Sequence, residues 1–194
     1  MNKRMLSFSP QQLQAIIAFQ ESNAIEQEWD HDSLNDTLEA WNYLLGQEFL
    51  NHEVILRSHL LLMKTRQTIP LSLKGAYRHG DIYIANRKGT NPQHLRTHMN
   101  AWIFKQNDLI RRCQEEGAET DETIEVFQDR WAKIVMQEHI AYEIIHPFAD
   151  GNGRTGRLFL NWTRVQMGLP ILVIWENTKC TKYYPIFKEA ESEL

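Results

Sequence analysis

The longest run of regular hydrophobic spacing in the chain covers residues 123–145 and stops at His146-Pro147. Its apolar side chains recur every three or four positions, which predicts one long buried helix. Proline disfavours helical backbone at the residue before it, so this helix should end at His146. We therefore expect the central helix of the fold to hold one imidazole at its C-terminal end.

Helical spacing also dominates most of the remaining chain. Helices are expected over residues 9–25, 33–45, 51–64 and 92–116, and again after the proline. The first of them should bury a stripe made by Leu13, Ile16, Ile17 and Ile25. Residues 77–85 lack this period and alternate in character around a glycine, which favours a β-hairpin. The prediction is a single all-α domain with one small hairpin.

Composition narrows the function classes. The 194 residues carry a net charge of −4, so nothing in the overall charge predicts nucleic-acid binding. No window approaches the ~20 apolar residues that a membrane helix needs, and no apolar core follows Lys3 and Arg4 as in a signal peptide. The two cysteines, Cys113 and Cys180, match no zinc or disulfide spacing. These features predict a cytoplasmic protein and leave its oligomeric state open.

The segment directly after the long helix, residues 146–157, reads His-Pro-Phe-Ala-Asp-Gly-Asn-Gly-Arg-Thr-Gly-Arg. Gly151 and Gly153 permit positive φ, which lets successive N–H groups turn towards one centre and bind an anion. A new helix should begin near Arg154, and its free N–H groups and dipole would point into the same turn. The backbone of this segment therefore predicts a phosphate site.

The side chains of the same segment suit a nucleotide triphosphate. Arg154 and Arg157 are three residues apart, hence on one helix face, where two guanidinium groups can bind adjacent phosphates. Asp150 supplies a hard oxygen ligand for Mg²⁺, which usually binds one or two carboxylates plus the substrate phosphates. His146 titrates near neutral pH and is the candidate general base.

The spacing of residues elsewhere in the chain suggests two other kinds of site, a P-loop and a zinc site. The nearest approach to a P-loop has Asp81 where lysine is required, which excludes that motif. A zinc site is a rival, because His139, Glu143 and His146 could share one helix face. A metallohydrolase built on these residues would leave both arginines and the glycine turn without a role.

Residues 146–157 resemble the Fic family signature His-x-Phe-x-Asp/Glu-Gly-Asn-Gly-Arg-x-x-Arg and match it at every defined position. The resemblance implies a helical Fic fold and transfer of AMP from ATP to a target protein, with release of pyrophosphate. By that resemblance His146 would deprotonate a Ser, Thr or Tyr hydroxyl, and Asp150 would hold Mg²⁺. The remaining motif positions would surround the phosphates: Gly151, Asn152, Gly153, Arg154 and Arg157.

A second resemblance lies near the end of the first predicted helix, at Ser22-Asn23-Ala24-Ile25-Glu26-Gln27. It is similar to the inhibitory motif of Fic proteins, Ser/Thr-x-x-x-Glu-Gly/Asn, in the class that has an N-terminal inhibitory helix. The resemblance implies that Ser22 and Glu26 are inhibitory residues. Glu26 would pair with Arg157 and keep it from the γ-phosphate. Gln27 departs from the expected Gly or Asn.

The resemblance implies further roles outside these two motifs. Residues 1–30 would form the inhibitory region and residues 31–194 the Fic domain. In the family a β-hairpin called the flap lies over the active site and clamps the target segment by strand-like pairing. Here the flap residues would be Ile82, Tyr83, Ile84 and Ala85. Tyr183-Tyr184 resembles an aromatic pair that contacts adenine, and His59 would be either a ligand contact or a hydrogen-bonded core residue.

Two alternatives to AMP transfer stay open at this point. The same site could remove AMP or transfer another phosphate-linked group, or the chain could be a catalytically silent module that retains the nucleotide cradle. Family members that transfer phosphate depart from the Gly-Asn-Gly-Arg core, which this chain keeps. The expected ligands are ATP and Mg²⁺, and the expected partner is a target protein, with self-modification as a further possibility.

Overall fold

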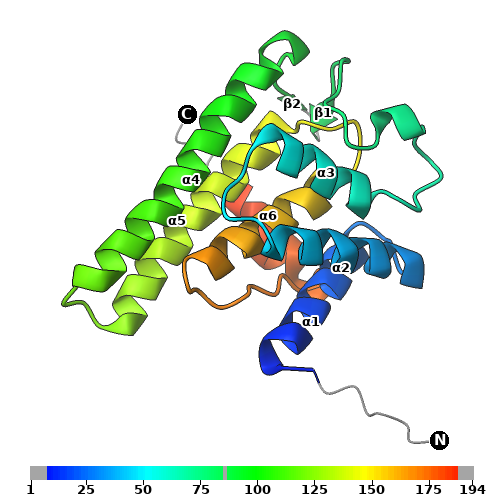
Figure 1. Ribbon diagram of the computed structural model, residues 1–194. Coiled ribbons are helices and arrows are strands. Elements are labelled where there is room, and N and C mark those ends of the chain that lie inside the picture. Colours follow the sequence, from blue (N-terminus) through cyan, green and yellow to red (C-terminus); the bar gives the residue numbers. More distant parts are fainter. Residues whose placement is uncertain (1–7, 85–86, 188–194) are drawn as a thin grey trace, which may run out of the picture.

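The computed structural model describes residues 8–84 and 87–187. Within these ranges the chain forms a bundle of α-helices with one small hairpin, so the predicted all-α class is confirmed (Figure 1). The helices are α1 (Pro10–Ile25), α2 (His31–Leu45), α3 (His52–Leu62), α4 (Leu95–Glu119), α5 (Ile124–Ile145) and α6 (Asn152–Gln166). No helix in the described ranges combines the length and the apolar character that crossing a membrane requires.

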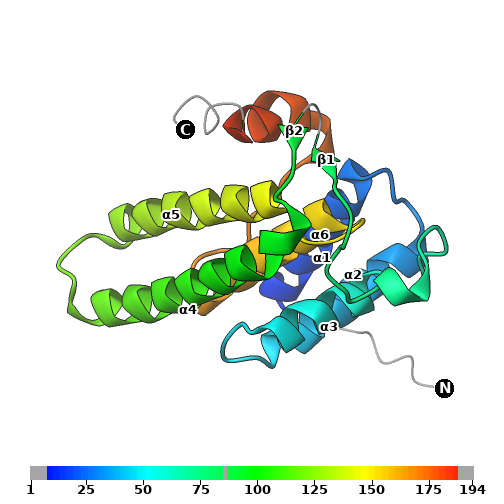
Figure 2. The ribbon, with the colours of Figure 1, turned by 90° about the horizontal axis from the view of Figure 1, so that it is seen from above.

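The centre of the bundle is α6, which contacts each of the other five helices (Figure 1). All its residues from Arg154 to Arg164 are buried. The longer α5 runs beside α4 as an antiparallel pair at one side of the molecule (Figure 2), and near its start Val126 is 56% exposed. The prediction that residues 123–145 form the central helix is therefore wrong, because the α4–α5 pair extends beyond the core. The predicted helix end at His146 is confirmed.

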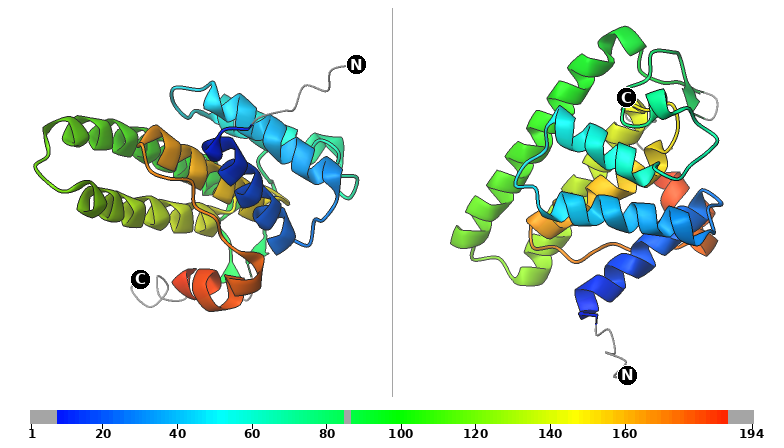
Figure 3. Two further views of the ribbon diagram at one scale, coloured as in Figure 1. Left: turned by 90° about the horizontal axis from the view of Figure 1, so that it is seen from below. Right: turned by 45° about the vertical axis from the view of Figure 1, so that its right-hand side comes forward.

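The first helix begins where its sequence predicts but buries a different face. Ser9 and Gln12 form a capping box, in which each side chain bonds to the backbone N–H of the other. Leu13 and Ile17 are 48% and 44% exposed, so the predicted apolar stripe is wrong at these positions. The helix packs instead through Phe19 and several small residues, which allow a close approach of backbones. This approach places α1 directly against α6 (Figure 3).

The predicted hairpin is present and short. Strand β1 (Tyr83–Ile84) pairs antiparallel with β2 (Arg87–Lys88), with Tyr83 opposite Lys88. It stands near the C-terminal end of α5 (Figure 2). Ala85, the last predicted flap residue, lies outside the described residues. Four short helical turns occupy the connections: η1 (Leu71–Leu73), η2 (Pro92–His94), η3 (Glu176–Thr178) and the π-helical η4 (Lys179–Tyr183).

The helix predicted over residues 92–116 ends later than expected. α4 continues through Gly117 to Glu119. The ring of Phe127 packs against this glycine, 3.3 Å from where a Cβ would stand. Gly117 therefore serves the close contact between α4 and α5 and does not end the helix.

Candidate active site

His146 ends α5 in a backbone conformation that is uncommon for a residue with a side chain. Its φ is 50° and its ψ is 65°, in the left-handed region. The ring Nδ1 lies 3.1 Å from the Glu143 carbonyl oxygen, so Nδ1 donates its hydrogen there and Nε2 keeps a lone pair. The side chain is 19% exposed, and burial lowers the pKa of His146 below its ordinary value. The ring is therefore a neutral base near neutral pH.

The loop after His146 is held by the amide group of one asparagine. Asn152 Oδ1 accepts a hydrogen bond from the Phe148 N–H, and Asn152 Nδ2 donates one to the Phe148 carbonyl, both at 2.8 Å. Gly151 has a φ of 74°, and a Cβ there would stand 2.6 Å from the Met63 sulfur. Because these two hydrogen bonds close the turn early, α6 begins at Asn152, before the predicted start at Arg154. The free N–H groups of its first turn are the donors of an anion site.

Arg154 is a buried cation whose hydrogen-bond donors are only partly used. It is 3% exposed, and its Nη2 lies 3.1 Å from the Met63 sulfur. Its Nε meets no hydrogen-bond partner in the described part of the chain. Burial lowers the pKa of this guanidinium, while the charges of Asp150 and Glu26 act in the opposite sense. An anion bound beside Arg154 would be strongly stabilised.

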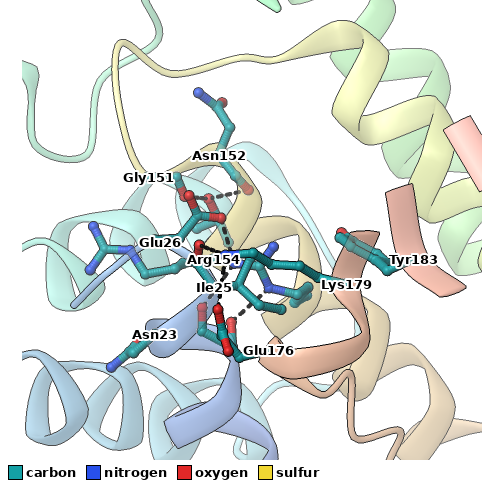
Figure 4. Close-up of polar contacts among 12 residues, drawn as sticks. Asn23, Ile25, Glu26, Gly151, Asn152, Arg154, Glu176, Lys179 and Tyr183 are labelled. Carbon is teal, nitrogen blue, oxygen red and sulfur yellow. Dashed lines mark hydrogen bonds and ion pairs between the residues drawn. The ribbon is translucent and has the colours of Figure 1, made fainter. Parts of the chain in front are cut away.

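Arg157, one turn further along α6, is held by the end of α1. Its Nε donates to the Ser22 hydroxyl at 2.8 Å, and its Nη2 donates to the Ser22 carbonyl at 3.0 Å and to Glu26 Oε1 at 2.6 Å. Glu26 also lies against Gly153, where a Cβ would overlap its Oε1. Figure 4 shows Glu26 between the end of α1 and the start of α6, beside Arg154. The carboxylate therefore occupies the helix N-terminus that favours an anion.

The residue after Glu26 ends α1 in spite of its side chain. Gln27 has a φ of 63°, and its N–H bonds to the Ala24 carbonyl at 3.0 Å. The Glu28 N–H bonds to the Asn23 carbonyl, also at 3.0 Å. Glycine or asparagine usually takes this position, because a side chain in the left-handed region costs about 1–2 kcal/mol. The helix therefore ends at the position where the resembling motif has Gly or Asn, with Gln27 under backbone strain.

The last described segment holds the end of α1 from the outside. Lys179 Nζ lies 3.1 Å from the Ile25 carbonyl oxygen and 3.3 Å from Glu176 Oε1 (Figure 4). The Glu176 N–H bonds to the Glu21 carboxylate at 2.8 Å. A lysine beside the last carbonyls of a helix is favourable. The position of Glu26 therefore depends on contacts from two sides.

The carboxylate of Asp150 is an accessible acidic group in the loop. Its side chain is 39% exposed, with Oδ1 accepting from the Gly151 N–H at 2.6 Å and Oδ2 3.9 Å from Arg66 Nε. One carboxylate beside a phosphate site fits Mg²⁺, which takes its remaining ligands from phosphates and water. Among the described residues no three His, Cys, Asp or Glu side chains converge as a ready-made metal site.

His59 orients the same loop from α3. Its Nε2 donates to the Asp150 carbonyl at 3.0 Å, and its Nδ1 accepts from the Gly75 N–H at 2.9 Å. The ring stacks on Phe148 with centroids 3.7 Å apart. Burial lowers the pKa of His59 to about 4, so the ring is neutral. Of the two roles left open by the sequence, this structure shows the hydrogen-bonded core histidine.

The rival zinc site is not formed. His139 Nε2 bonds to the Tyr183 hydroxyl at 2.7 Å, and burial lowers the pKa of His139 to about 3. His146 leaves the helical path at its left-handed backbone and uses Nδ1 for the Glu143 carbonyl. Among the described residues no group of three His, Cys, Asp or Glu side chains could hold a metal ion, so the rival reading as a metallohydrolase finds no support here.

The sequence profile of the Fic/DOC family matches residues 49–163, more than half of the chain. The chain belongs to the Fic/DOC family. The matched Fic range contains the hairpin, His146 and both motif arginines, whereas Ser22 and Glu26 precede it. The contact between Glu26 and Arg157 thus joins the family core to the segment before it.

Curated relatives of this Fic chain are named protein adenylyltransferases. A probable protein adenylyltransferase of Aquifex aeolicus is 47% identical over 53 residues, which are 27% of the chain and 16% of the relative. The protein adenylyltransferase fic-1 of Caenorhabditis elegans is 23% identical over 171 residues, which are 88% of the chain and 27% of the relative. The chain therefore spans less than a third of the length of these relatives.

Solved structures share the Fic fold. A fragment of Fic-1 from C. elegans has a TM-score of 0.69 at 18% identity, covering 96% of the chain and 60% of the fragment. A Fic domain containing signaling protein from Bacteroides thetaiotaomicron has a TM-score of 0.68 at 17% identity, covering 92% of the chain and 72% of that protein. The helical Fic fold inferred from the motif is confirmed.

The Fic motif and the end of α1 come together around one site. The charges of Glu26 and Asp150 both raise the pKa of His146, in opposition to its burial.

Tyr183 and Tyr184 differ in exposure. Tyr183 is 4% exposed, with the Arg157 guanidinium 5.9 Å from its ring centre, and Tyr184 is 40% exposed. The adenine contact assigned to this pair stays a prediction.

A pocket of about 260 Å³ lies between the hairpin and α5. Ile84 and Ile144 contribute apolar walls, and Phe187 closes a side. Glu143 also lines it, and burial raises the pKa of this carboxyl group to about 7. The pocket is therefore mostly apolar, with one acidic group close to His146.

Two residues of the site had no signal in the sequence. Arg78 binds the end of α5, and Lys179 binds the end of α1. Both act on main-chain carbonyls, which every residue has, so no spacing or partner residue marks these contacts. Only the three-dimensional path of the chain reveals them.

Proposed function

We propose that this Fic protein transfers AMP from Mg²⁺-bound ATP to a hydroxyl group of a protein side chain, and that Glu26 restrains it. The observation that carries the proposal is the state of the two motif arginines. Arg157 is held by Ser22 and Glu26, whereas Arg154 keeps an unused donor beside the N-terminus of α6. A site that binds a carboxylate next to a further guanidinium suits a polyphosphate.

His146 is the proton acceptor of the proposed transfer. Its Nε2 takes the proton of the acceptor hydroxyl as the hydroxyl oxygen bonds to the α-phosphorus of ATP. The bond between the α-phosphorus and the bridging oxygen breaks, and pyrophosphate leaves with that oxygen. Arg154, Arg157 once released, and the first N–H groups of α6 stabilise the charge that gathers on the departing phosphates.

Asp150 would hold Mg²⁺ through its exposed carboxylate, together with phosphate oxygens and water. The ion would neutralise part of the phosphate charge. His59 and Gly151 orient this aspartate, because they bond to its carbonyl and to its Oδ1. We expect loss of either contact to weaken metal-dependent ATP binding.

The pocket between the hairpin and α5 is the proposed adenine site. Its apolar walls include Ile84 and Ile144, and Phe187, three residues after Tyr184, also lines it. The hairpin, with Ile82, Tyr83 and Ile84, would then pair with the target segment as an added strand. Tyr83 is 69% exposed and is open to such a contact. A Ser, Thr or Tyr of the target, or of the protein itself, would supply the hydroxyl.

Glu26 would restrain the enzyme by competing with the substrate. Its carboxylate takes the donor of Arg157 that the terminal phosphate needs, and it repels an incoming triphosphate. The side chain of Arg157 is 3% exposed and that of Glu26 is 40% exposed, so Glu26 can swing towards solvent while Arg157 stays in place. Restraint would then be released by movement at the end of α1.

The test compares ATP labelled on the α-phosphate with ATP labelled on the γ-phosphate. Wild type, Glu26→Gly and His146→Ala are incubated with Mg²⁺, with the protein itself and a whole-cell protein extract as acceptors. Glu119→Gly is the matched control, because Glu119 ends α4 and is exposed. We expect covalent α-label that rises about tenfold in Glu26→Gly, as loss of a charged hydrogen-bond partner should allow, and disappears in His146→Ala.

The other functions give different results in the same assay. Covalent γ-label would indicate phosphate transfer, and release of AMP from labelled protein would indicate removal of AMP. Tight ATP binding by Glu26→Gly without any covalent label would identify a silent nucleotide-binding module. Each of these outcomes would replace the proposed AMP transfer.

A further inference from the structure

Arg78 precedes the hairpin and reaches the end of α5. It is 4% exposed, and its Nε donates to the His146 carbonyl at 2.7 Å. Its Nη2 lies 3.3 Å from the Ile145 carbonyl oxygen, and its own main-chain N–H donates to the Pro147 carbonyl at 3.0 Å. Arg78 therefore binds the carbonyl groups of three successive residues, 145 to 147, around the proposed base.

The same guanidinium holds both ends of the hairpin. Its Nη1 donates to the carbonyl of Gly80, before β1, at 2.8 Å, and its Nη2 donates to the carbonyl of Thr90, after β2, at 2.6 Å. Gly89 lies beside it, since a Cβ there would stand 3.4 Å from Nη2. The Gly89 N–H closes the hairpin on the Ile82 carbonyl at 2.9 Å. One side chain thus joins the base of the hairpin to the end of α5.

We propose that Arg78 is a positioning residue that fixes the hairpin, and any target segment paired with it, relative to His146. The inference rests on the proposed function, in which the hairpin holds the acceptor and His146 takes its proton. Arginine suits the task because its planar group presents five N–H donors in fixed directions, whereas lysine presents one compact charge. A cation is also favourable at the C-terminal end of α5.

Arg78 also acts on the proton affinity of His146. The charged groups near this ring are Arg78, Glu26 at the end of α1, Asp150 in the loop and Glu143 on α5. Burial is the largest influence that lowers the pKa of His146, and the charge of Arg78 lowers it further, while Glu26 and Asp150 raise it. Removing the positive charge should therefore raise the pKa of His146, which a purely mechanical role of Arg78 would not predict.

The experiment compares Arg78→Gln and Arg78→Lys in the full chain carrying Glu26→Gly. The matched control is Arg111→Gln, an arginine that is 58% exposed and pairs with Asp108 and Glu115 on α4. Three quantities are measured: hydrogen exchange of the Gly89 amide, the pKa of His146 by NMR titration, and α-label transferred to the protein itself. Affinity for a non-hydrolysable ATP analogue is measured alongside.

Arg78→Gln should speed exchange of the Gly89 amide about tenfold, because charge-assisted bonds at both ends of the hairpin are lost. It should raise the pKa of His146 and lower label transfer at saturating ATP about tenfold, with a smaller loss of affinity for the ATP analogue, because Ile84 of the hairpin lines the proposed adenine pocket. Arg78→Lys should also speed the exchange but should keep the low pKa of His146, because it keeps the charge. Arg111→Gln should change none of these quantities.

Exchange of Gly89 that stays unchanged in a folded Arg78→Gln protein would overturn the proposal. If Arg78→Gln does not fold, Arg78→Lys is the deciding variant. Exchange of the Gly89 amide that is no faster in Arg78→Lys than in Arg111→Gln would also overturn the proposal. Absence of α-label from every chain and acceptor would instead overturn the proposed AMP transfer. The exchange and titration results need no label and would still decide the role of Arg78.

Discussion

Arg157 Nη2 lies 2.6 Å from Glu26 Oε1, a contact that joins α6 to the end of α1 between residues 131 positions apart in the chain. Ser22 holds the same guanidinium through its hydroxyl and its carbonyl. In the proposed mechanism, Glu26 and a phosphate of ATP compete for Arg157. A change that weakens the contact between Glu26 and Arg157 should favour phosphate binding at Arg157 by the same free energy, and the reverse should also hold.

Substitutions at Ser22 and Glu26, the proposed inhibitory residues, should tighten ATP binding to different degrees. Glu26→Gln should raise the affinity for a non-hydrolysable ATP analogue about tenfold, because it removes a charge-assisted bond and a repelling carboxylate. Ser22→Ala should raise it only about threefold, because it removes a neutral hydrogen bond. Calorimetric titration checks both values, and Gln20→Ala on the exposed side of α1 is the control. Equal affinities of wild type and Glu26→Gln would contradict the competition.

Replacing the strained residue at the end of α1 should stabilise the protein. Gln27→Gly should raise the free energy of unfolding by about 0.5–1 kcal/mol, because glycine adopts the left-handed backbone without the cost that glutamine has there. Gln20→Gly, in the interior of the same helix, should lower it by about 1 kcal/mol. Urea denaturation measures both. A loss of stability in Gln27→Gly would show that the side chain does more than occupy the turn.

Removing the partly satisfied arginine should separate stability from binding. Arg154→Met should weaken binding of the ATP analogue about 100-fold, since a direct phosphate contact is lost. The same change should keep or raise the free energy of unfolding by about 1 kcal/mol, because a buried charge is replaced by an apolar side chain. Arg164→Met is the control: Arg164 is buried on the same helix, donates to the Pro170 carbonyl at 2.7 Å and should matter for stability alone.

Two buried histidines should make the fold sensitive to acid. Burial lowers the pKa of His59 to about 4 and that of His139 to about 3, from an ordinary value of 6.5. Below pH 6.5 the unfolded chain therefore binds two more protons at these sites than the folded chain, and stability falls as the pH falls. Glu143 acts oppositely, because burial raises its pKa to about 7 and the folded state holds an extra proton between about 7 and 4.5.

The two histidines, together with His146, whose pKa burial also lowers, outweigh Glu143 in this window, so the unfolded chain binds more protons than the folded chain. Denaturation should accordingly show lower stability at pH 5 than at pH 6.5, by on the order of 1–2 kcal/mol. Glu143→Gln removes the opposing group and should steepen the dependence of stability on pH. A slope that stays the same in Glu143→Gln would mean that this carboxyl group is ionised in the folded protein.

Local features of the site could be predicted from the sequence. Within residues 146–157, the glycine turn and the spacing of Arg154 and Arg157 depend on neighbours only a few positions away, whereas the helix begins two residues before its predicted start. The pairing of Glu26 with Arg157 was different, because residues so far apart are brought together by the fold. Its prediction came from the resemblance of Ser22–Gln27 to a known inhibitory motif.

Contacts that depend on the shape of a partner could not be predicted. Leu13 and Ile17 satisfy the helical period of a buried stripe, yet α1 buries the neighbouring face where Ala15 and Ala18 allow close packing. Arg78 gives no sign of its role, since its acceptors are main-chain carbonyls. Periodicity locates a helix, but it does not decide which face the rest of the bundle covers.

Lys179 binds the Ile25 carbonyl at the end of α1, and the next residue, Cys180, carries an exposed thiol, while Cys113 is buried. A fluorophore attached to Cys180 would therefore lie next to the contact between Lys179 and Ile25, which would break if α1 moved away from the rest of the bundle. The natural chain already carries an attachment point from which undocking of that helix can be followed optically in real time.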